Sequence, residues 1–364
     1  MDTIFWLFAK TQEVVIMRIL TSSDLQTLLD FPSVIDAVET AYQDKGTGQG
    51  VIWPMIYHEF ISDQADMDIR SGYLKSQHAY GVKLLSWFAE NEAKGLPELN
   101  GTVTIYDDQT GLPKGVVNAA ALTGYRTGAA GAVASRLLAN PDATNLLIVG
   151  AGAQALYQIM AQLTVLPHIS TVTIVDLVAP QKATQLAETL TQQLSEQFLP
   201  TIDTHAAVYE RLTTQLSHLT VTASDDLENA TKTAQVIVTA TPSTKAMIQS
   251  DWVQPGTHLN TIGADMTGKQ EVDETIFKTA NSYVDDRQQA AQVGETQNAI
   301  RANILQEDQL TEIGDLLATS TQNQWTPNQM TLFDSTGIAL QDIAAANLAL
   351  EKAETLTAGH SIDL

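Results

Sequence analysis

The chain has 364 residues, enough for two domains of ordinary size, and its 44% apolar and 17% charged residues are typical of a globular protein. Its 42 acidic residues outnumber 19 basic ones and give a formal net charge of -23, so nucleic acid is not expected as a partner. The absence of cysteine excludes disulfides, thiolate metal sites and cysteine nucleophiles.

The start of the chain and the histidines narrow the class of protein further. The seven histidines show no metal-ligand spacing, so no metal is expected. A chain without cysteine fits a reducing compartment, and we expect a cytoplasmic protein. The apolar run at residues 4–9 is too short to cross a bilayer, so no membrane partner is expected. We interpret residues 1–16 as an extension and Met17 as the natural start; finding those residues in the native protein by N-terminal sequencing would contradict this.

The first third of the chain is predicted to be α+β. A short strand at residues 17–20 precedes two helical patterns, the second opened by Pro32. Alternating or apolar runs between Gly and Asn turns then predict strands, at residues 51–60, 66–74, 79–88 and 101–118.

From residue 123 onward, strands alternate with helices. A helix of small residues is predicted at 123–139, with Thr123 or Thr127 as a candidate N-cap, and a strand, glycine turn and helix follow at 145–163. Further strands are predicted in later segments, at residues 171–177, 235–243, 257–265 and 281–286. This alternation is typical of βαβ units and a parallel sheet, and a long helix closes the chain within residues 332–350.

A glycine motif between the strand and the helix at 145–163 predicts a dinucleotide site. Gly150 permits a tight turn, Gly152 allows close approach of a pyrophosphate, and Ala155 is small enough to replace a third glycine. The helix N-terminus then offers free N–H groups to phosphate. Asp176 ends the next strand, where it would bind a ribose 2′-hydroxyl and repel a 2′-phosphate, so NAD is expected rather than NADP. The alternative is a purely structural turn.

Two basic residues are candidates for ligand binding. Lys83 lies in an otherwise apolar strand, so it faces either solvent or a polar site, since lysine is seldom buried without a partner. Arg126 lies in a helix of small residues and either grips a carboxylate bidentately or forms a surface ion pair.

The loops after two later strands carry polar residues where open α/β sheets bind ligands. The loop at residues 239–243 is expected to meet the cofactor, or else is an ordinary proline-containing loop. Asp265 follows a predicted strand and is suited to exchange protons with an amine. Asp273 is interpreted as a helix cap, and Lys269 and Glu271 as solvated or loop-ordering charges.

These segments together resemble the ornithine cyclodeaminase/mu-crystallin family. The resemblance covers nearly all of the chain after Met17, in matching order and spacing. It is carried by "YGVK", "ENEAKGLPELNGTVTIYDDQTGLPKGVV", "LTGYRTGAAGAVASRLLA", "VGAGAQA", "IGADMTGKQEVD", "VDDRQQAAQVGE" and "FDSTGIALQDIAAA".

The resemblance implies an α/β fold with two domains, and a homodimer. A Rossmann-type, doubly wound parallel sheet that binds NAD is expected at residues 125–332. A discontinuous α+β domain for substrate binding and dimerisation is expected at residues 17–124 and 333–364. The expected cofactor contacts are Thr127, Gly150, Gly152, Ala153, Gln154, Asp176, Thr239, Ala240 and Thr241.

The resemblance also implies a reaction on a small amino-acid substrate. Arg126 and Lys83 would hold its carboxylate, and Asp265 would exchange protons with its amine, so that Lys83 and Asp265 are the expected catalytic residues. NAD would accept a hydride from Cα and leave an imine. In a cyclodeaminase a side-chain amine then attacks and ammonia leaves, whereas in an alanine dehydrogenase water attacks and NADH departs. Mu-crystallin-like ketimine reductases lack the aspartate, so Asp265 favours the amino-acid-oxidising branches.

One stretch departs from the family pattern. Many members carry a Pro-x-Arg run in the second strand, and residues 53–60 contain no arginine. Arg70 is interpreted as its substitute, and Asp68 as the substitute for a glutamate that cyclodeaminases carry nearby. We expect an ornithine cyclodeaminase-like enzyme. The alternatives are an alanine or other amino-acid dehydrogenase or imine reductase, and a non-catalytic, crystallin-like binding protein.

Overall fold

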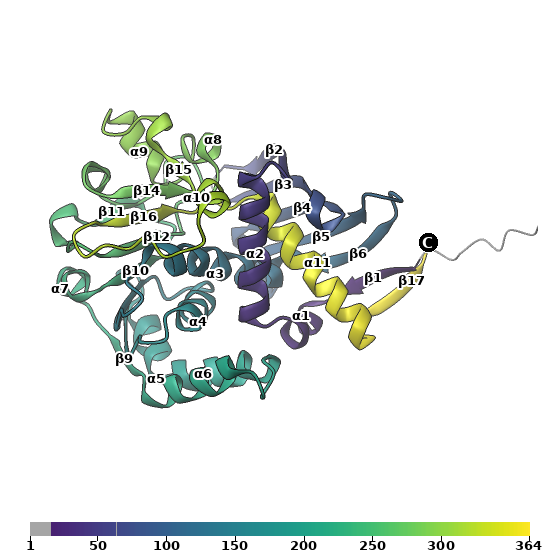
Figure 1. The fold of residues 1–364 in the computed structure, drawn as a ribbon, viewed down its shortest axis with the longest axis horizontal. Helices are drawn as coiled ribbons and strands as arrows, with labels where there is room; N and C mark the ends of the chain where they lie inside the picture. The colour runs from purple at the N-terminus through teal and green to yellow at the C-terminus, as the bar shows by residue number, and fades with distance from the viewer. Residues whose placement is uncertain (1–15, 63) are drawn as a thin grey trace, which may run out of the picture.

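The computed structural model describes residues 16–62 and 64–364, which form two large β-sheets and a small two-stranded one, with helices on and between the large sheets (Figure 1). Residues 1–15 of the predicted extension lie outside this described part, and Ile16 begins the first strand. Among the helices of the described ranges, none is long and apolar enough to span a bilayer.

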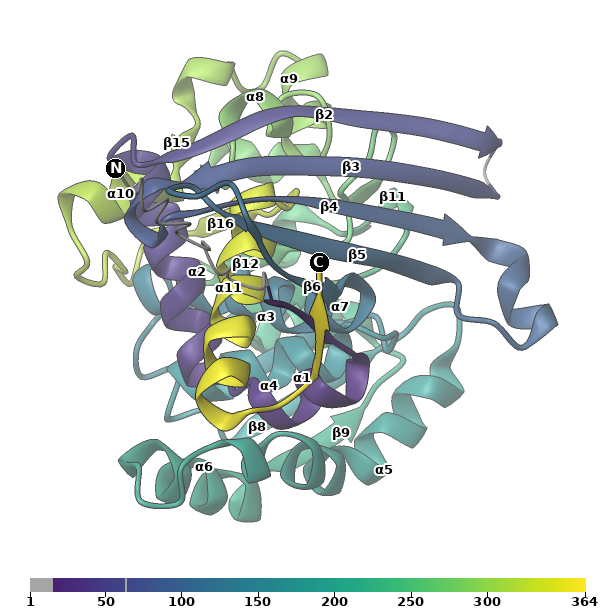
Figure 2. The ribbon, with the colours of Figure 1, turned by 90° about the vertical axis from the view of Figure 1, so that its right-hand side faces the viewer.

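The first sheet has seven strands in the order β17-β1-β6-β5-β4-β3-β2. Neighbouring strands are antiparallel, except for the parallel pair β1 and β6. The bounds are β1 Ile16–Leu20, β2 Gly50–Ile61, β3 Ala65–Leu74, β4 Ala79–Phe88, β5 Leu99–Asp107, β6 Pro113–Asn118 and β17 His360–Asp363. Figure 2 shows β2 to β5 as long neighbouring strands whose far ends reach beyond the helices.

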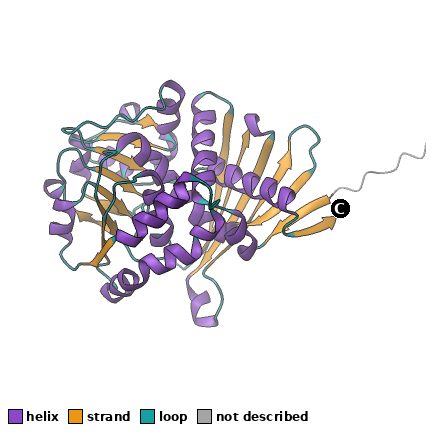
Figure 3. Cartoon of the chain, turned by 60° about the horizontal axis from the view of Figure 1, so that its bottom comes forward, coloured by secondary structure: helices purple, strands orange, loops and turns teal. Residues whose placement is uncertain are grey.

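Helices from both ends of the chain cover one face of this sheet. They are α1 (Ser22–Leu28), α2 (Phe31–Gly46) and α11 (Ala339–Leu356). The approach of α11 needs glycine in the sheet, because a Cβ at Gly72 would lie 2.6 Å from the Val51 carbonyl oxygen and 3.0 Å from the Leu340 side chain. The helices that separate the two sheets can be followed in Figure 3.

The second sheet has eight parallel strands in the order β15-β14-β16-β12-β10-β7-β8-β9. The bounds are β7 Asn145–Val149, β8 Thr171–Val175, β9 Thr220–Ala223, β10 Val236–Thr239, β12 His258–Thr261, β14 Asn281–Val284, β15 Thr311–Glu312 and β16 Thr331–Asp334. The chain runs outward from β7 to β9 and then returns to β10 on the other side of β7. This switch confirms the predicted doubly wound sheet and leaves a crevice at the carboxyl ends of β7 and β10.

The remaining elements surround the second sheet. The helices are α3 Ala119–Leu138, α4 Ala155–Val165, α5 Pro180–Gln197, α6 Ala207–His218, α7 Leu227–Thr233, α8 Arg287–Ala290, α9 Thr296–Arg301 and α10 Ile313–Thr319. A small parallel pair, β11 (Thr244–Ile248) and β13 (Gln270–Val272), lies beside the main sheet.

Helix α3 begins earlier than predicted. Its N-cap is Asn118, whose side-chain oxygen accepts the N–H of Ala121 at 2.9 Å. The prediction of Thr123 or Thr127 as the cap is wrong, because both lie inside the helix and the Thr123 hydroxyl donates to the Ala119 carbonyl instead. The domain boundaries predicted after residues 124 and 332 lie inside α3 and β16, so continuous elements join the two sheets.

Candidate functional site

The glycine turn after β7 lies at the switch point of the parallel sheet. Gly150 has a φ of +107°, and a Cβ there would lie 2.6 Å from the carbonyl oxygen of Ala240, in the loop after β10. Only glycine fits this approach of the two strand-end loops without strain. Apart from Gly152 itself and its two chain neighbours, no described residue has a heavy atom within 4 Å of the Cβ position of Gly152, so open space adjoins the turn before α4.

Asp176, at the carboxyl end of β8, closes the glycine turn. Its carboxylate accepts the N–H of Ala151 at 3.0 Å and those of Val178 and Ala179 at 3.1 and 2.8 Å. Burial opposes its ionisation, but these backbone hydrogen bonds outweigh burial and lower the pKa of Asp176. The predicted ribose-binding acid is therefore an anion in contact with the turn.

A cavity of about 210 Å³ adjoins this crevice, with walls from both sheets. It brings together predicted substrate residues and predicted cofactor residues. Its lining consists of Arg70, Thr123, Arg126, Thr127, Gln154, Ala240, Thr241, Pro242, Ile262, Gly263, Asp265, Lys269, Ser335, Thr336 and Gly337. The other predicted site residues lie outside this lining, namely Asp68, Lys83, Gly150, Gly152, Ala153, Asp176 and Thr239.

Two polar atoms at the cavity fit a polar ligand such as a dinucleotide. Within the described part of the chain, the buried Thr127 hydroxyl and the buried Gln154 side-chain oxygen have no hydrogen-bond partner. Buried polar groups are normally hydrogen-bonded, so atoms of this kind on a cavity wall indicate a binding site. The open space at Gly152 and the N-terminus of α4, which has no side-chain cap, are suited to receive the phosphates of such a ligand.

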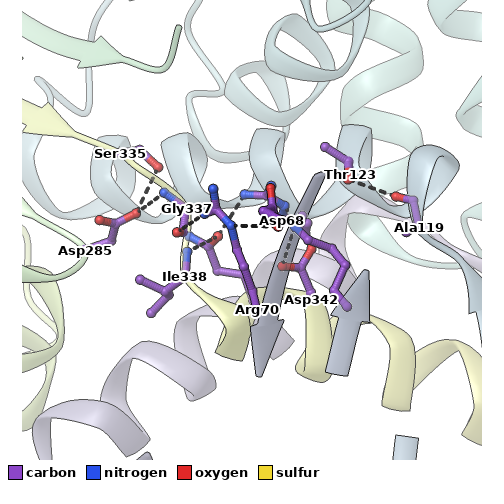
Figure 4. Close-up of polar contacts among 12 residues, drawn as sticks. Asp68, Arg70, Ala119, Thr123, Asp285, Ser335, Gly337, Ile338 and Asp342 are labelled. Carbon is purple, nitrogen blue, oxygen red and sulfur yellow. Dashed lines mark hydrogen bonds and ion pairs between the residues drawn. The ribbon is translucent and has the colours of Figure 1, made fainter. Parts of the chain in front are cut away.

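Arg70 enters the cavity from β3 and is held by backbone carbonyls. Its guanidinium donates to the carbonyl oxygen of Gly337 at 2.5 Å (Figure 4). It also donates to the carbonyl oxygen of Thr336 at 3.2 Å. Its Nε lies 3.3 Å from Asp68 on the same strand. Asp285, at the end of β14, fixes this acceptor loop by accepting the N–H of Gly337 at 2.6 Å.

Lys83 and Arg126 share one buried carboxylate, that of Asp342 on α11. Lys83 Nζ lies 2.9 Å from Asp342, and Arg126 Nε lies 3.2 Å from its other oxygen. The side chains of Lys83 and Asp342 are each 1% exposed. Burial lowers the pKa of Lys83 to about 8, although Asp342 opposes the change. The structure excludes a solvent-facing Lys83 and a surface ion pair for Arg126.

Asp265 lies on the loop after β12 and lines both the cavity and an adjoining groove of about 620 Å³. Its side chain is 46% exposed and forms an ion pair with Lys269 at 2.6 Å. The groove runs under the far ends of β2 to β5 and contains the predicted Asp68, with Asp66 and Glu98. It therefore offers acidic side chains beyond Asp265.

Glu271 ties the loop after β10 to the loop after β12. One carboxylate oxygen accepts the Thr241 N–H at 2.7 Å and the Thr241 hydroxyl at 2.8 Å. The other accepts the Gly263 N–H at 2.8 Å and the Thr239 hydroxyl at 2.7 Å. Burial raises the pKa of Glu271, and these four hydrogen bonds oppose the rise. Glu271 is thus a buried residue that clamps the two loops together. The Thr239 hydroxyl donates its hydrogen to this carboxylate.

Further buried acids support the same edge of the sheet. Glu295 accepts the Glu271 N–H at 2.5 Å, and Asp334 accepts the N–H of Thr296 at 2.8 Å. Burial raises the pKa of Asp334 to about 7. Burial also raises the pKa of Glu295 well above its usual value, and the nearby carboxylates of Glu271 and Asp334 raise it further. These groups hold strand-end loops in place.

The helix that Asp273 was predicted to cap is a short 3₁₀ turn, Glu274–Lys278. The Asp273 carboxylate accepts the Thr275 N–H at 2.8 Å, which confirms the predicted cap.

Sequence and structure comparisons identify the relatives of this chain. The model of the ornithine cyclodeaminase/mu-crystallin family matches residues 16–208 and 199–356. The chain belongs to this family. Over 288 residues it is 32% identical to the L-lysine cyclodeaminase of Streptomyces rapamycinicus, an alignment that covers 78% of this chain and 74% of the relative.

Two solved structures share the whole fold of this family member. An archaeal alanine dehydrogenase dimer with bound NAD is 29% identical, with a TM-score of 0.80 over 96% of this chain and 99% of the other. The Thermococcus litoralis Δ1-pyrroline-2-carboxylate reductase, in complex with NADH and L-proline, is 25% identical, with a TM-score of 0.82 over 95% and 100%. The family thus combines one fold with dehydrogenase, reductase and cyclodeaminase activities.

Sequence reasoning about this family member missed the residues that hold the site together. They are Asp285, Glu295, Asp334 and Asp342, together with Gln341, whose side-chain oxygen accepts a hydrogen bond from Arg126 at 3.0 Å. Of the two roles predicted for Glu271, the structure supports loop ordering and excludes a solvated side chain. The sequence did contain an indication for Asp342, because this aspartate lies on the apolar face of the last long helix, where a buried charged residue needs a partner. The identity of that partner depends on tertiary contacts, which the helical pattern does not specify.

Proposed function

We propose that this protein is an NAD-dependent enzyme that oxidises an L-amino acid at Cα and, in the manner of an ornithine cyclodeaminase, cyclises a diamino acid with loss of ammonia. The observation that carries the proposal is the single cavity in which Arg70, Arg126 and Asp265 meet beside the Gly150 turn. Guanidinium groups bind a carboxylate, and a carboxylate at the strand end exchanges protons with an amine.

Each side chain has a separate task in the proposed reaction. Arg126 and Arg70, fixed by Asp342 and by the Gly337 carbonyl, hold the α-carboxylate and so orient Cα. Asp265 accepts a proton from the substrate amine and returns it later, while Lys269 fixes its orientation. Bound NAD supplies the hydride acceptor. The turn at Gly150, the free end of α4 and Asp176 are the groups suited to hold that cofactor.

The acidic groove favours a diamino acid over alanine. Asp66, Asp68 and Glu98 line it together with Asp265, and Lys269 is the basic residue in its lining. A substrate with a second amine gains favourable charge contacts there, whereas alanine has no group that reaches it. An alanine dehydrogenase or imine reductase remains the second candidate, supported by the whole-chain similarity to an archaeal alanine dehydrogenase and a pyrroline-carboxylate reductase.

A substrate panel tests the proposal. The purified protein is incubated with NAD or NADP and with ornithine, lysine, 2,4-diaminobutyrate or alanine, while NADH and ammonia are both measured. We expect ammonia without accumulating NADH from a diamino acid, and a preference for NAD because Asp176 repels a 2′-phosphate. Ammonia together with stoichiometric NADH from alanine would instead identify a dehydrogenase, and tight NAD binding without turnover would favour a binding protein.

We also propose that two copies of the chain associate through the outer face of the seven-stranded sheet. Leu84 is 42% exposed and alternates with the inward-facing Lys83, so it lies on the face away from α11. Aromatic rings continue this face, with Trp53 against Tyr80 and Tyr80 stacked on Tyr106. Large exposed apolar surfaces mark interaction sites, and the similar alanine dehydrogenase is a dimer.

Leu84→Lys is expected to convert the dimer to monomer, because it buries a lysine charge at the interface. Analytical ultracentrifugation of wild type and variant measures the change. Leu356→Lys, at an exposed leucine at the end of α11, is the control and keeps the dimer. A monomeric wild type, or a dimeric Leu84→Lys protein, contradicts this interface.

A further inference from the structure

The loop that carries Asp265 is held at its root and at its tip by different groups. At the root, Gly263 donates its N–H to the Glu271 carboxylate at 2.8 Å. The tip, residues 265–269, turns at Gly268, whose φ is +85°. The Asp265 side chain is 46% exposed and pairs with Lys269 of the same tip, so packing around the side chain does not fix it. The position of this carboxylate therefore depends on the backbone of the tip.

Helix α9 supplies side-chain contacts to this backbone. The amide nitrogen of Gln297 donates to the Met266 carbonyl oxygen at 3.1 Å, and the amide oxygen accepts the Gly268 N–H at 3.1 Å. The neighbouring Asn298 donates to the Lys269 carbonyl oxygen at 3.1 Å. These two side chains thus bind three of the four residues that follow the predicted catalytic aspartate.

The start of α9 is anchored to the strands around it. The N–H and the hydroxyl of Thr296 both donate to Asp334, at the end of β16, at 2.8 Å. The preceding Glu295 accepts the N–H groups of Glu271 and Val272, in β13, at 2.5 and 3.3 Å. The helix is therefore fixed to the sheet independently of its contacts with the loop tip.

The Gln297 amide has a defined orientation. Its side chain is 1% exposed, and its nitrogen also donates to the Gly294 carbonyl oxygen at 2.7 Å. The nitrogen thus faces two carbonyl oxygens and the oxygen faces an N–H, so a flipped amide would lose all three bonds. A buried and fully bonded side chain of this kind transmits the position of α9 to the loop tip.

We propose that Gln297 is a positioning residue of the proposed reaction: from α9 it sets the loop tip so that Asp265 reaches the substrate amine, and Asn298 supports it by holding Lys269. This inference rests on the proposed function, because it assumes that Asp265 exchanges protons with that amine. A proton passes between two groups only at hydrogen-bond distance, so a displacement of about 1 Å lowers turnover although the carboxylate is still present.

Two variants remove these contacts. Gln297→Met keeps the length of the side chain but removes its three hydrogen bonds, so kcat is expected to fall about 10- to 100-fold while the KM for NAD stays within about twofold of wild type. Asn298→Ala removes one bond from a half-buried position, and kcat is expected to fall about three- to tenfold. Both proteins are expected to fold, because Asp334 and Glu295 still anchor α9.

A double-mutant cycle separates positioning of Asp265 from general damage to the site. If Gln297 acts through Asp265, replacing that carboxylate leaves nothing for Gln297 to position. The kcat of Asp265→Asn/Gln297→Met is then expected to lie within about twofold of that of Asp265→Asn alone. A further loss of about 10- to 100-fold in the double variant contradicts the proposal, because independent effects multiply. A wild-type kcat in Gln297→Met contradicts it as well.

Gln329 offers a matched control at the opposite end of the parallel strands. Its side-chain amide donates to the Thr279 carbonyl oxygen at 3.1 Å, just before β16 and β14 begin. Gln329→Met therefore makes the same chemical change away from the cavity, and its kcat is expected to equal that of wild type. Melting temperatures of all variants report general destabilisation. A loss of kcat in Gln329→Met as large as in Gln297→Met contradicts a role specific to α9.

Hydrogen exchange tests the anchoring without turnover. Because the Gly268 N–H donates to Gln297, the amides of residues 266–269 are expected to exchange about tenfold faster in Gln297→Met than in wild type. Mass spectrometry of a peptide spanning residues 263–272 measures this rate. Faster exchange supports the anchoring, and unchanged exchange contradicts it. A wild type without turnover on any substrate of the panel contradicts the proposed function, and the exchange rates then decide by themselves whether Gln297 holds the loop.

Discussion

Asp265→Asn is expected to lower kcat by about two to four orders of magnitude while the affinity for NAD stays within about twofold of wild type. An asparagine side chain fills the same space but accepts no proton from the substrate amine. Steady-state kinetics with the best substrate of the panel measure kcat, and quenching of protein fluorescence by NAD measures cofactor binding. Cofactor affinity is expected to be kept because Asp265 pairs with Lys269 and lines the cavity, whereas Gly150 and Gly152 of the glycine turn lie outside the cavity lining.

The nearby Asp273 offers a matched control for this prediction. Asp273→Asn makes the same substitution eight residues further along the chain, at an N-cap position where asparagine caps as well as aspartate. Its kcat is expected to equal that of wild type. A normal kcat in Asp265→Asn, with correct folding, would show that the proton is transferred by another group.

Glu271→Gln is expected to destabilise the protein by about 2 to 5 kcal/mol and to weaken NAD binding at the same time. Each carboxylate oxygen of Glu271 accepts one backbone N–H, from Thr241 or from Gly263. A glutamine amide therefore places its NH₂ group against one of these donors in either orientation, and leaves that donor unsatisfied. Urea unfolding measures the stability, and fluorescence titration at low urea measures the NAD affinity.

Glu274, three residues further along the same segment, is the control, since its carboxylate accepts a hydrogen bond from the Gln270 side chain rather than from the backbone of the strand-end loops. Glu274→Gln is expected to change stability by less than about 0.5 kcal/mol. An equally small change in Glu271→Gln would mean that the two strand-end loops keep their positions without the clamp, and would contradict its role.

The fold was predictable from sequence where the signal is local. The parallel sheet follows from short apolar strands alternating with helices, and the glycine turn follows from Gly150 and Gly152 directly after one of those strands. Helix starts are harder to predict from sequence, because Asn118, Thr123 and Thr127 are all residue types that cap helices. In the structure β6 ends at Asn118, and α3 begins directly after it.

The site was predictable only in part, for the same reason. Arg126 and Asp265 lie next to recognisable motifs, so their positions at the cavity follow from the topology. The partners that fix the site come from distant parts of the chain: Asp342 reaches Lys83 from the closing helix, and Asp285 reaches Gly337 from another strand. Such pairings depend on how the two sheets pack, which neither periodicity nor spacing records.

The junction between β16 and α11 has a consequence for folding during synthesis. Strands β3 and β4 and helix α3 leave the ribosome before the parallel sheet, but the carboxylate that pairs with Lys83 and Arg126 follows only after all strands of that sheet. Until α11 arrives, Lys83 on β4 and Arg126 on α3 lack their anion, and the face of the first sheet at Gly72 is uncovered. The face of the first sheet is therefore exposed to aggregation while the parallel sheet is being synthesised. Although most strands of the first sheet are synthesised first, this face is covered only when α11 follows the parallel sheet.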